Sequence, residues 1–537
     1  FAAAALACLA LLVRHLTGRT LAGGLSALAL AVSPVFWSQA TIAEVYSLHL
    51  LLLTLMLWTL VRWERAKRGG GRWLLALAAA FGMGLAHHRT AALFLPGMLL
   101  ALILAGRGWP AGEPSRRPGA GGWPRPWAAA LALGLPLLLY LYIPLIGARF
   151  GSLDGSYRNT LAGFLRHVLA LDYGAFFTSN PLGQSRDLTF YVKLWADQFG
   201  PAGLLLGLAG LAIPWPRRRV WLACLLSLAV VVLFALFYRV ADVEVFLLPA
   251  FLIWAVGIGT ALGRVEGLVA RAARGRVPRL AGVLLPLLFA VQPAILAANA
   301  WPAMDRSRDW AVHDAALDAL SQPLPERAVI IGILGEMTVL RYFQWTQGVR
   351  SDLVTVAADR EAERWAALEA ALAERGEAYL TRPLAGVEQH YHLDAIGSLA
   401  RVRPMSARSP GALCRGKELW PGMCLQSHDT DYWQAHGRSR LRVTLRWLAT
   451  EAPTGDVRLS LRLHAGDGRL VAQHDSRPVH EMYPTTAWQA GEEIVDQHDL
   501  AWDSGAAGGE CEVVLVLYDP ADAHELARES LGTVVIP

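Results

Sequence analysis

The sequence predicts a polytopic α-helical membrane domain, followed by a small α/β domain and a C-terminal all-β sandwich. Three observations indicate this fold class. Hydrophobic residues make up 54% of the 537 residues, and the mean hydropathy of +0.35 is too apolar for an ordinary soluble chain. The apolar stretches lie almost wholly before residue 300. After that point the pattern changes twice, first to alternating helices and strands and then to strands alone.

Residues 1–300 form the predicted multi-spanning domain. Its apolar stretches are residues 21–36, 45–61, 73–86, 91–105, 128–147, 202–214, 220–238, 245–262 and 281–298. Several of them reach the roughly 20 residues that span a bilayer. The stretches between residues 73 and 105 are shorter, so we expect them to be tilted, re-entrant or buried within the bundle.

The chain opens on Phe1, and FAAAALACLALLVRH reads as the second half of a spanning helix without the layout of a signal peptide. We therefore expect a fragment that lacks its N-terminal part. At least half a helix would precede Phe1.

The charges of the connecting loops predict the orientation of the chain. Every second connection is basic, as in RHLTGR, RWERAKRGGGR and PRRR, and such loops stay on the cytoplasmic side. The connections between them, SQATIAEVY, AHHRT, residues 149–200 and RVADVEV, therefore face outward with the tail. We expect a multi-pass inner-membrane protein with extracytoplasmic C-terminal domains. The net charge of +5 reflects this topology and indicates no nucleic-acid partner.

The tail divides into three parts. Residues 301–400 contain the short apolar strands AVIIGIL, DLVTVA and EAYLTR between helical patterns, which is typical of a βαβ layer with a parallel sheet. Residues 401–437 are expected to be a linker, and the strand-only pattern of residues 438–537 predicts a β-sandwich. Cys414 and Cys424 lie in this outward tail and can form a disulfide if the compartment is oxidising.

Polar side chains gather at three outward turns, each where one predicted helix ends and the next begins. They are Glu44 and Tyr46 in the first turn, His87, His88 and Arg89 in the second, and Arg239, Asp242 and Glu244 in the third. Taken singly, each can cap a helix or pair at the membrane interface. Together they favour a site, because Arg and His at the headgroup level suit a phosphate and a nearby carboxylate suits a general base.

The same segments carry a resemblance to a known family. SPVFWSQATIAEVYSLHLLLL, GLAHHRTAALFLPG, DVEVFLLPAFLIWAVG and, in the tail, VLRYFQWTQGVRSDLVTV resemble the bacterial protein O-mannosyltransferase-like membrane proteins, a branch of the GT-C glycosyltransferase superfamily. The AEVY and HRT blocks are the most specific parts. The resemblance runs from Phe1 to about residue 400, and the final sandwich resembles β domains appended to such enzymes.

The resemblance implies a GT-C-like membrane glycosyltransferase. Such an enzyme takes a sugar, here a mannose-like hexose, from a polyprenyl-phosphate donor and transfers it outside the cytoplasm to a protein or glycan acceptor. The donor arrives laterally among the membrane lipids. Arg89, His88 and Arg239 would then meet its phosphate, with Tyr46 and His87 beside them.

The resemblance also bears on the catalytic base. Enzymes of this superfamily usually carry it in the first external loop, which would precede Phe1. Glu44, Asp242 and Glu244 are then supporting candidates for catalytic residues. No cofactor is firmly implied, and a requirement for a divalent metal stays open.

Two weaker signals lie in the tail. DTD at residues 429–431 matches a motif that binds a metal and a nucleotide sugar in a different glycosyltransferase fold, but we expect it in a linker and assign it no function. His390 and His392 have strand spacing and suit a metal, but the sequence places no third ligand, so we expect a solvated pair.

The long loop of residues 149–200 suits a role in transfer. This outward loop contains LAGFLRHVLALDY, whose amphipathic spacing suits the outer interface, and it is a candidate gate for donor or acceptor.

Two functions other than transfer are compared with the sequence. A transporter is disfavoured because the predicted spans hold almost no ionisable residues. The alternative that stays open is a non-catalytic membrane scaffold that displays carbohydrate- or partner-binding domains.

Overall fold

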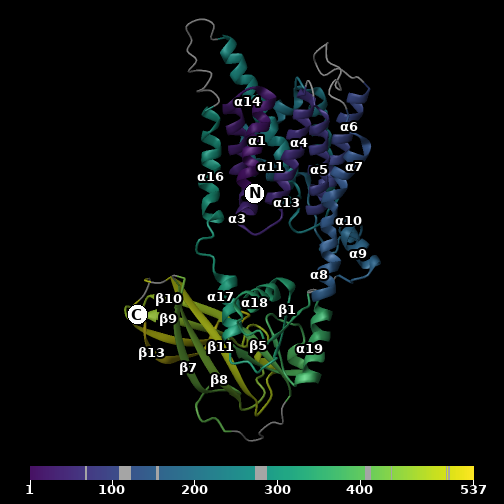
Figure 1. The fold of residues 1–537 in the computed structure, drawn as a ribbon. Coiled ribbons are helices and arrows are strands. Elements are labelled where there is room, and N and C mark those ends of the chain that lie inside the picture. The colour runs from purple at the N-terminus through teal and green to yellow at the C-terminus, as the bar shows by residue number, and fades with distance from the viewer. Residues whose placement is uncertain are drawn as a thin grey trace. The chain divides into compact units, whose positions relative to one another are not determined.

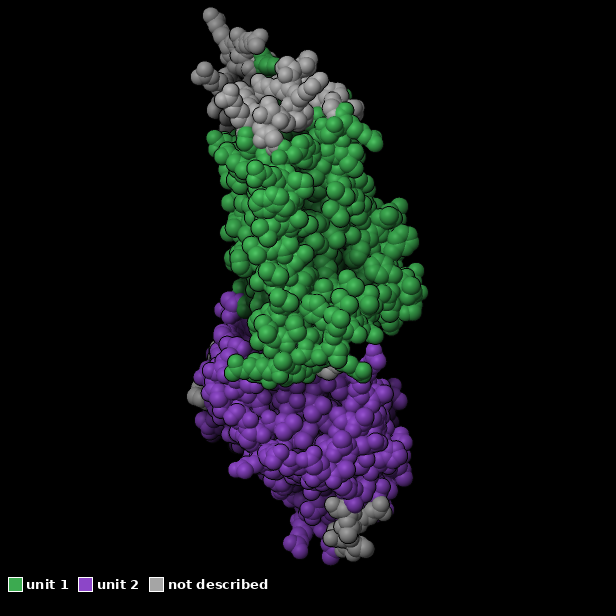
Figure 2. Space-filling model, turned by 45° about the vertical axis from the view of Figure 1, so that its right-hand side comes forward, with its two compact units in different colours: residues 1–306 green, residues 307–537 purple. Residues whose placement is uncertain are grey.

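The computed structural model shows a helical unit, Phe1–Arg306, and a second unit, Ser307–Pro537, that contains all the strands (Figure 1; Figure 2). The residues that the structure describes are 1–66, 69–107, 123–152, 157–272, 287–405, 413–436, 438–503, 505 and 508–536.

The helical unit contains the predicted apolar stretches as helices. They are α1 (Ala2–Thr17), α2 (Thr20–Ala31), α3 (Pro34–Thr41), α4 (Tyr46–Arg65), α5 (Gly71–His87), η1 (Arg89–Phe94), α6 (Leu95–Gly106), α7 (Pro126–Leu137), η2 (Leu138–Leu141), α8 (Tyr142–Phe150), α9 (Leu161–Val168), η3 (Leu171–Gly174), α10 (Ala175–Thr178), α11 (Leu188–Ala212), α12 (Arg218–Phe237), α13 (Val243–Phe246), α14 (Leu248–Ala272) and α16 (Val291–Met304). Within the described residues, six helical segments are long and apolar enough to cross a membrane, or seven if α2 and α3 form one bent span. The predicted polytopic membrane domain is confirmed. The first part of the predicted stretch 281–298 lies outside the described residues.

The predicted stretch 21–36 is bent by 73° between α2 and α3. Pro34 stands at the first position of α3, where its missing N–H costs least, and it cannot continue α2. The amide of Val35 donates to Oε1 of the buried Gln198 at 2.9 Å. A side chain of α11 therefore satisfies the start of α3.

Helix α11 begins at Leu188, well before the predicted stretch 202–214. It is broken at Gly200, whose φ of 59° is left-handed and is followed by Pro201. Gln292 of α16 bridges the break, since its side chain accepts from the amide of Ala202 at 2.9 Å and donates to the carbonyl of Phe199. The side-chain amide of Gln292 thus takes the place of backbone hydrogen bonds that the helix loses at the break.

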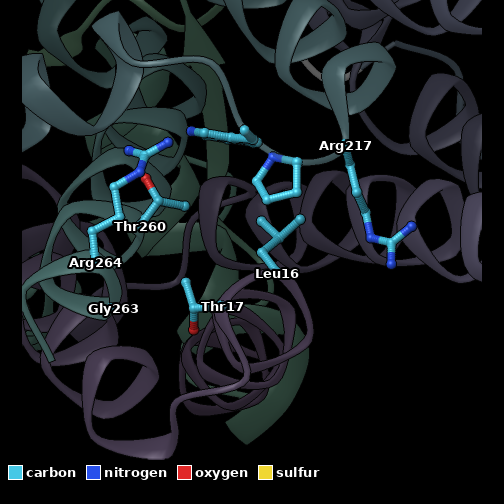
Figure 3. A pocket seen from close by; sticks show the side chains of 8 residues that line it. Leu16, Thr17, Arg217, Thr260, Gly263 and Arg264 are labelled. Carbon is cyan, nitrogen blue, oxygen red and sulfur yellow. The ribbon is translucent and has the colours of Figure 1, made fainter. Parts of the chain in front are cut away.

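Within the described residues, the connections of the helical unit lie at its two ends, and one of these ends is rich in arginine (Figure 1). At the basic end, Arg65 of α4 donates to the carbonyl of His15 at the end of α1 at 2.8 Å. Arg264 of α14 donates there to the last carbonyls of α11 and the following turn, Ile213 at 2.9 Å and Pro214 at 3.0 Å. A cavity of about 150 Å³ at this end has Arg264 and Arg217 on opposite sides (Figure 3).

The other end of the helical unit contains the α3–α4, α5–η1 and α12–α13 turns. Trp301, near the end of α16, packs edge-on against Trp37 of α3 with ring centroids 6.0 Å apart. The last helix of the unit therefore ends beside the three turns that the sequence singles out.

The second unit begins with an α/β layer. Its elements are α17 (Ala311–Ser321), β1 (Val329–Gly332), α18 (Leu334–Gln347), β2 (Val354–Ala357), α19 (Glu361–Arg375), β3 (Ala378–Leu380), η4 (Val387–Gln389), β4 (Tyr391–Ile396) and β5 (Leu399–Pro404). The sheet has the order β2-β1-β3-β5-β4, with β1 parallel to β2 and β3. The predicted parallel βαβ layer is present, and the antiparallel hairpin β4–β5 extends it.

Two antiparallel sheets follow. Their strands are β6 (Lys417–Trp420), β7 (Met423–Ala435), β8 (Arg438–Ala449), β9 (Arg458–Ala465), β10 (Leu470–Ser476), β11 (Glu493–Asp503), β12 (Gly509–Tyr518) and β13 (Glu525–Ile536). The orders are β10-β9-β12-β13 and β11-β8-β7-β6, so the predicted all-β C-terminal region is confirmed. The short helix η5 (Thr485–Ala487) lies between β10 and β11.

Strands, rather than the expected linker, occupy much of the described part of residues 401–437. The DTD motif lies inside β7. The strand is buried at its start, and its later residues are polar and largely exposed. The disulfide that the sequence left open is formed between Cys414 and Cys424, with the two Cα atoms 5.8 Å apart. It fastens the segment before β6 to the start of β7.

The α/β layer and the sandwich share one core, which includes a buried polar contact between β4 and β11. His392 is buried here, not solvated as we expected, and its Nδ1 bonds to Glu492 while its Nε2 lies 3.1 Å from Asp394. Burial alone would lower the pKa of His392, but the two carboxylates outweigh it and raise that pKa to about 9. His390 stays exposed, so the two histidines do not share a site.

Candidate functional site

The three predicted turns of the helical unit meet through aromatic contacts. Phe246, at the end of α13, packs edge-on against Tyr46 at the start of α4, with centroids 6.0 Å apart. His88 lies 5.7 Å from the ring of Tyr46 and 6.3 Å from that of Phe246. One residue from each turn thus contributes to a single cluster, which we call the turn cluster (Tyr46, His88 and Phe246).

Carboxylates surround Tyr46. Its hydroxyl interacts electrostatically with Asp242, Glu44 and Glu244, all three of the carboxylates that the sequence selects. Glu44 and Asp242 are exposed and Glu244 is half-buried. Within the described residues none of the three forms an ion pair, and the side chain of Asp242 does not cap α13 although it directly precedes that helix. Helix capping therefore does not account for Asp242.

The two histidines of the second turn have different partners. His87 Nε2 donates to the carbonyl of Val45 at 2.9 Å, which ties the end of α5 to the α3–α4 turn. His88 Nδ1 lies 2.6 Å from the hydroxyl of Thr90. The same hydroxyl lies 3.1 Å from Nε2 of His49, so Thr90 joins two imidazoles.

His49 is a residue of this site that the sequence analysis missed. It is 1% exposed, its ring lies 4.8 Å from that of His88, and its Nδ1 has no partner among the described residues. The sequence spacing could have identified it, because His49 follows Tyr46 by three residues and therefore shares its face of α4. An imidazole inside a spanning helix usually marks a functional position.

Arg89 holds a segment of the long loop of residues 149–200. Its Nε donates to the carbonyl of Val168 at 2.8 Å, and its Nη2 donates to the carbonyl of His167, at the C-terminal end of α9. A cation suits this position because the end of a helix carries partial negative charge. The guanidinium that we expected to meet a phosphate is thus engaged with backbone carbonyls in this structure.

The loop also reaches the third turn. The amide of Arg239 donates to the carbonyl of Phe176 in α10 at 3.1 Å, and its side chain is exposed. Arg186 donates to the carbonyls of Val240 at 2.6 Å and Ala241 at 2.8 Å. The segment that the sequence singles out as a candidate gate therefore contains short helices and contacts two of the three turns.

The described residues of the three turns do not gather the three metal-binding side chains that a metal site needs. Within the described chain, the group of His, Cys, Asp and Glu side chains with that geometry lies in the second unit. The three turns instead offer imidazoles, a phenol, carboxylates and the exposed Arg239. Such groups can bind an anion and accept a proton.

The helical unit has the fold of GT-C membrane glycosyltransferases. The structure is similar to the crystal structure of ArnT from Cupriavidus metallidurans bound to undecaprenyl phosphate, with a TM-score of 0.50 and 15% sequence identity over 76% of this chain and 83% of that chain. The apo state of the same protein matches with a TM-score of 0.43, at 16% identity over 75% and 81% of the two chains. The arabinofuranosyltransferase AftD from Mycobacteria matches at 0.37, with 12% identity over 99% and 53%; these last two scores do not establish a shared fold.

The sequence comparison is narrower. Residues 9–109 match the family model described as the N-terminal domain of the protein O-mannosyl-transferase TMEM260. This confirms the resemblance to protein O-mannosyltransferases over the segment that contains the first two turns and His49. No curated protein sequence matches the chain.

Proposed function

We propose that the chain is a membrane glycosyltransferase that moves a mannose-like hexose from a polyprenyl-phosphate donor to an extracytoplasmic acceptor, such as a protein hydroxyl. The observation that carries this proposal is the meeting of Tyr46, His88 and the Asp242 turn at one end of a GT-C bundle. The similar ArnT structure contains undecaprenyl phosphate, a lipid phosphate of the donor's class.

The geometry supports a division of roles. The donor phosphate is anionic and reaches the site from the bilayer, so the exposed Arg239 and the imidazoles of His87 and His88 would meet it. Arg89 would join them only by leaving the carbonyls of α9, which would couple donor binding to movement of the loop. The loop would then act as the gate.

The transfer step needs a proton acceptor. The acceptor oxygen attacks the anomeric carbon, the bond between that carbon and the phosphate oxygen breaks, and the lipid phosphate leaves. The hydroxyl proton goes to a carboxylate, for which Asp242 is the best placed of the supporting candidates because it is exposed and does not cap α13. Glu44 and Glu244 would support it, since both carboxylates also act electrostatically on Tyr46.

We further propose that the turns and the second unit lie outside the cytoplasm. The chain leaves the helical unit at the end that holds the turns, where Trp301 contacts Trp37. The disulfide between Cys414 and Cys424 suits an oxidising compartment. Both observations fit an inner-membrane protein whose C-terminal domains are extracytoplasmic.

The test is transfer by the purified full chain in lipid nanodiscs, supplied with a radiolabelled polyprenyl-phosphate mannose and an acceptor peptide. Replacing Arg239 with Ala should raise the KM for the donor about tenfold or more, because a charge-assisted contact to phosphate is worth about 1.5–3 kcal/mol. Arg271→Ala is the matched control, since Arg271 is an exposed arginine at the other end of the bundle. Equal donor kinetics in the two variants would contradict the phosphate role. A folded chain that transfers no sugar would favour the scaffold.

A further inference from the structure

Three side chains of the second unit converge on one point. His313 Nδ1 lies 3.0 Å from Oδ1 of Asp314, and His436 Nδ1 lies 3.0 Å from the same oxygen. All three ligand atoms lie within 4.8 Å of one another. His313 and Asp314 come from α17 and His436 comes from the turn between β7 and β8, more than a hundred residues along the chain.

The backbone holds His436 in an unusual place. Ala435 pairs with Arg438 across the hairpin, which leaves a two-residue turn. His436 has a φ of 51°, a left-handed conformation for which such turns normally use Asn, Asp or Gly. Histidine is one of the few residues other than these that are enriched at positive φ, so the turn holds its imidazole here without severe strain.

Aromatic packing fixes both imidazoles. The ring of His436 stacks on Trp310, with centroids 3.9 Å apart and planes 6° from parallel. His313 meets the edge of Phe343 at 5.2 Å and stands nearly perpendicular to His436 at 5.0 Å. The two rings are thus oriented before any ligand arrives, which lowers the cost of binding one.

The carboxylate is oriented as well. Arg440 of β8 lies 3.2 Å from Oδ2 of Asp314, which leaves Oδ1 directed at the imidazoles. Ligands of bound metals are commonly held in this way by an outer partner.

We propose that His313, Asp314 and His436 bind a divalent transition metal of the zinc class. Two imidazole nitrogens and one carboxylate oxygen are ligands that Zn²⁺ accepts, whereas Mg²⁺ and Ca²⁺ prefer oxygen alone. With bonds of about 2.0–2.1 Å, neighbouring ligands of a tetrahedral zinc are roughly 3.3 Å apart. The two nitrogen–oxygen distances of 3.0 Å are close to that spacing.

Two of the three candidate ligands lie in the wall of a cavity. Asp314 and His436 line this cavity of about 460 Å³, together with Asp431, Trp433 and Arg442. Three protein ligands and an open position are typical of zinc that holds a water or a ligand oxygen. Asp431, from the DTD motif to which the sequence assigned no function, lies in the wall of this cavity. This inference does not rest on the proposed transfer activity.

The test uses the full chain, purified without a polyhistidine tag, stripped with a chelator and titrated with ZnCl₂ by calorimetry. We expect about one equivalent of Zn²⁺ to bind, and Co²⁺ in its place to give the visible absorption of a four-coordinate nitrogen and oxygen site. His436→Asn removes the ligand and keeps a residue that favours the left-handed turn. Binding of this equivalent should fall at least tenfold in His436→Asn and in His313→Ala.

His390→Ala is the matched control, because His390 is an exposed histidine of the same unit outside the cluster. It should bind Zn²⁺ as the unmodified chain does. The proposal is overturned if the folded chain binds no Zn²⁺ at micromolar concentration. It is also overturned if His436→Asn, with an unchanged circular dichroism spectrum, binds as much as His390→Ala.

Discussion

The turns of the helical unit and the contact between β4 and β11 both gather charged side chains, but they hold them in opposite ways. At the strand contact, Asp394 is buried and receives Arg401 at 2.8 Å and the amide of Val495 at 3.0 Å. At the turns, Asp242 is exposed and has no ion pair among the described residues. Buried charge must be paired to be tolerated, so the first arrangement stabilises the fold. The second leaves its charges available to a ligand.

The largest effect is expected at the strand contact. Burial alone would raise the pKa of Asp394, but His392 and Arg401 lower it well below its usual range. Asp394→Ala would leave Arg401 and the amide of Val495 without their acceptor, and it would leave His392 with Glu492 alone. We expect the free energy of unfolding to fall by about 3–5 kcal/mol, measured by urea unfolding of the full chain in detergent with tryptophan fluorescence.

Asp429→Ala is the control for that measurement. Asp429 is exposed on β7 and accepts only from the neighbouring amide of Thr430, at 2.9 Å, so its replacement should change the unfolding free energy by less than about 0.5 kcal/mol. Equal destabilisation by the two variants would remove the distinction between the buried network and an ordinary surface carboxylate.

The opposite result is expected at the turns. Asp242→Asn should lower the rate of sugar transfer about a hundredfold, since general-base catalysis contributes about 10²–10⁴-fold. Its unfolding free energy should change by less than about 0.5 kcal/mol, because the side chain is exposed. Asp197→Asn is the control, as Asp197 is also exposed in the helical unit but pairs with Lys193. If Asp242→Asn unfolds more easily and transfers normally, the carboxylate has a structural role.

The same contrast shows what the sequence could predict. Helices and strands were found where apolar residues recur with a regular period, as in α4 and β1. The start of α11 at Leu188 was not found, because Gly200 and Pro201 interrupt the pattern and only Gln292, far along the chain, repairs the break. Strand β7 was missed because its exposed half reads as a polar linker.

Within the candidate site, the sequence predicted residues and not their partners. The turns were found because charged residues between apolar runs are conspicuous. The link from His88 through Thr90 to His49 depends on α4 lying beside the α5–η1 turn, which the sequence does not show. Arg89 was assigned to a phosphate because nothing in the sequence shows that α9 ends beside it.

A pH titration sharpens the comparison further. The pKa of His392 is about 9 in the folded chain and about 6.5 when unfolded, so its contribution is complete below pH 6.5 and is lost as the pH rises through 9. We expect the unfolding free energy of the second unit to fall by about 3 kcal/mol between pH 6.5 and 9.5.

His392→Gln should flatten that dependence, because glutamine does not titrate. Burial lowers the pKa of His480 and of His474, so these two histidines affect stability only below about pH 6.5 and outside this window. An unchanged slope in His392→Gln would show that another group controls the titration.

The smallest effect is expected at Thr90, whose hydroxyl joins the imidazoles of His88 and His49. Thr90→Val keeps the shape of the side chain and removes the hydroxyl that joins His88 to His49. With its ring no longer held, His88 should support transfer about tenfold less well, and the unmade hydrogen bonds should cost about 1–2 kcal/mol of stability. Thr90→Ser restores the hydroxyl and should restore transfer.

Thr59→Val is the matched control, since Thr59 is a buried threonine of α4 that bonds only to its own helix. If Thr90→Val and Thr59→Val lose the same stability and neither loses transfer, then the His49–Thr90–His88 chain is packing, and the turns differ from the β4–β11 contact only in their exposure.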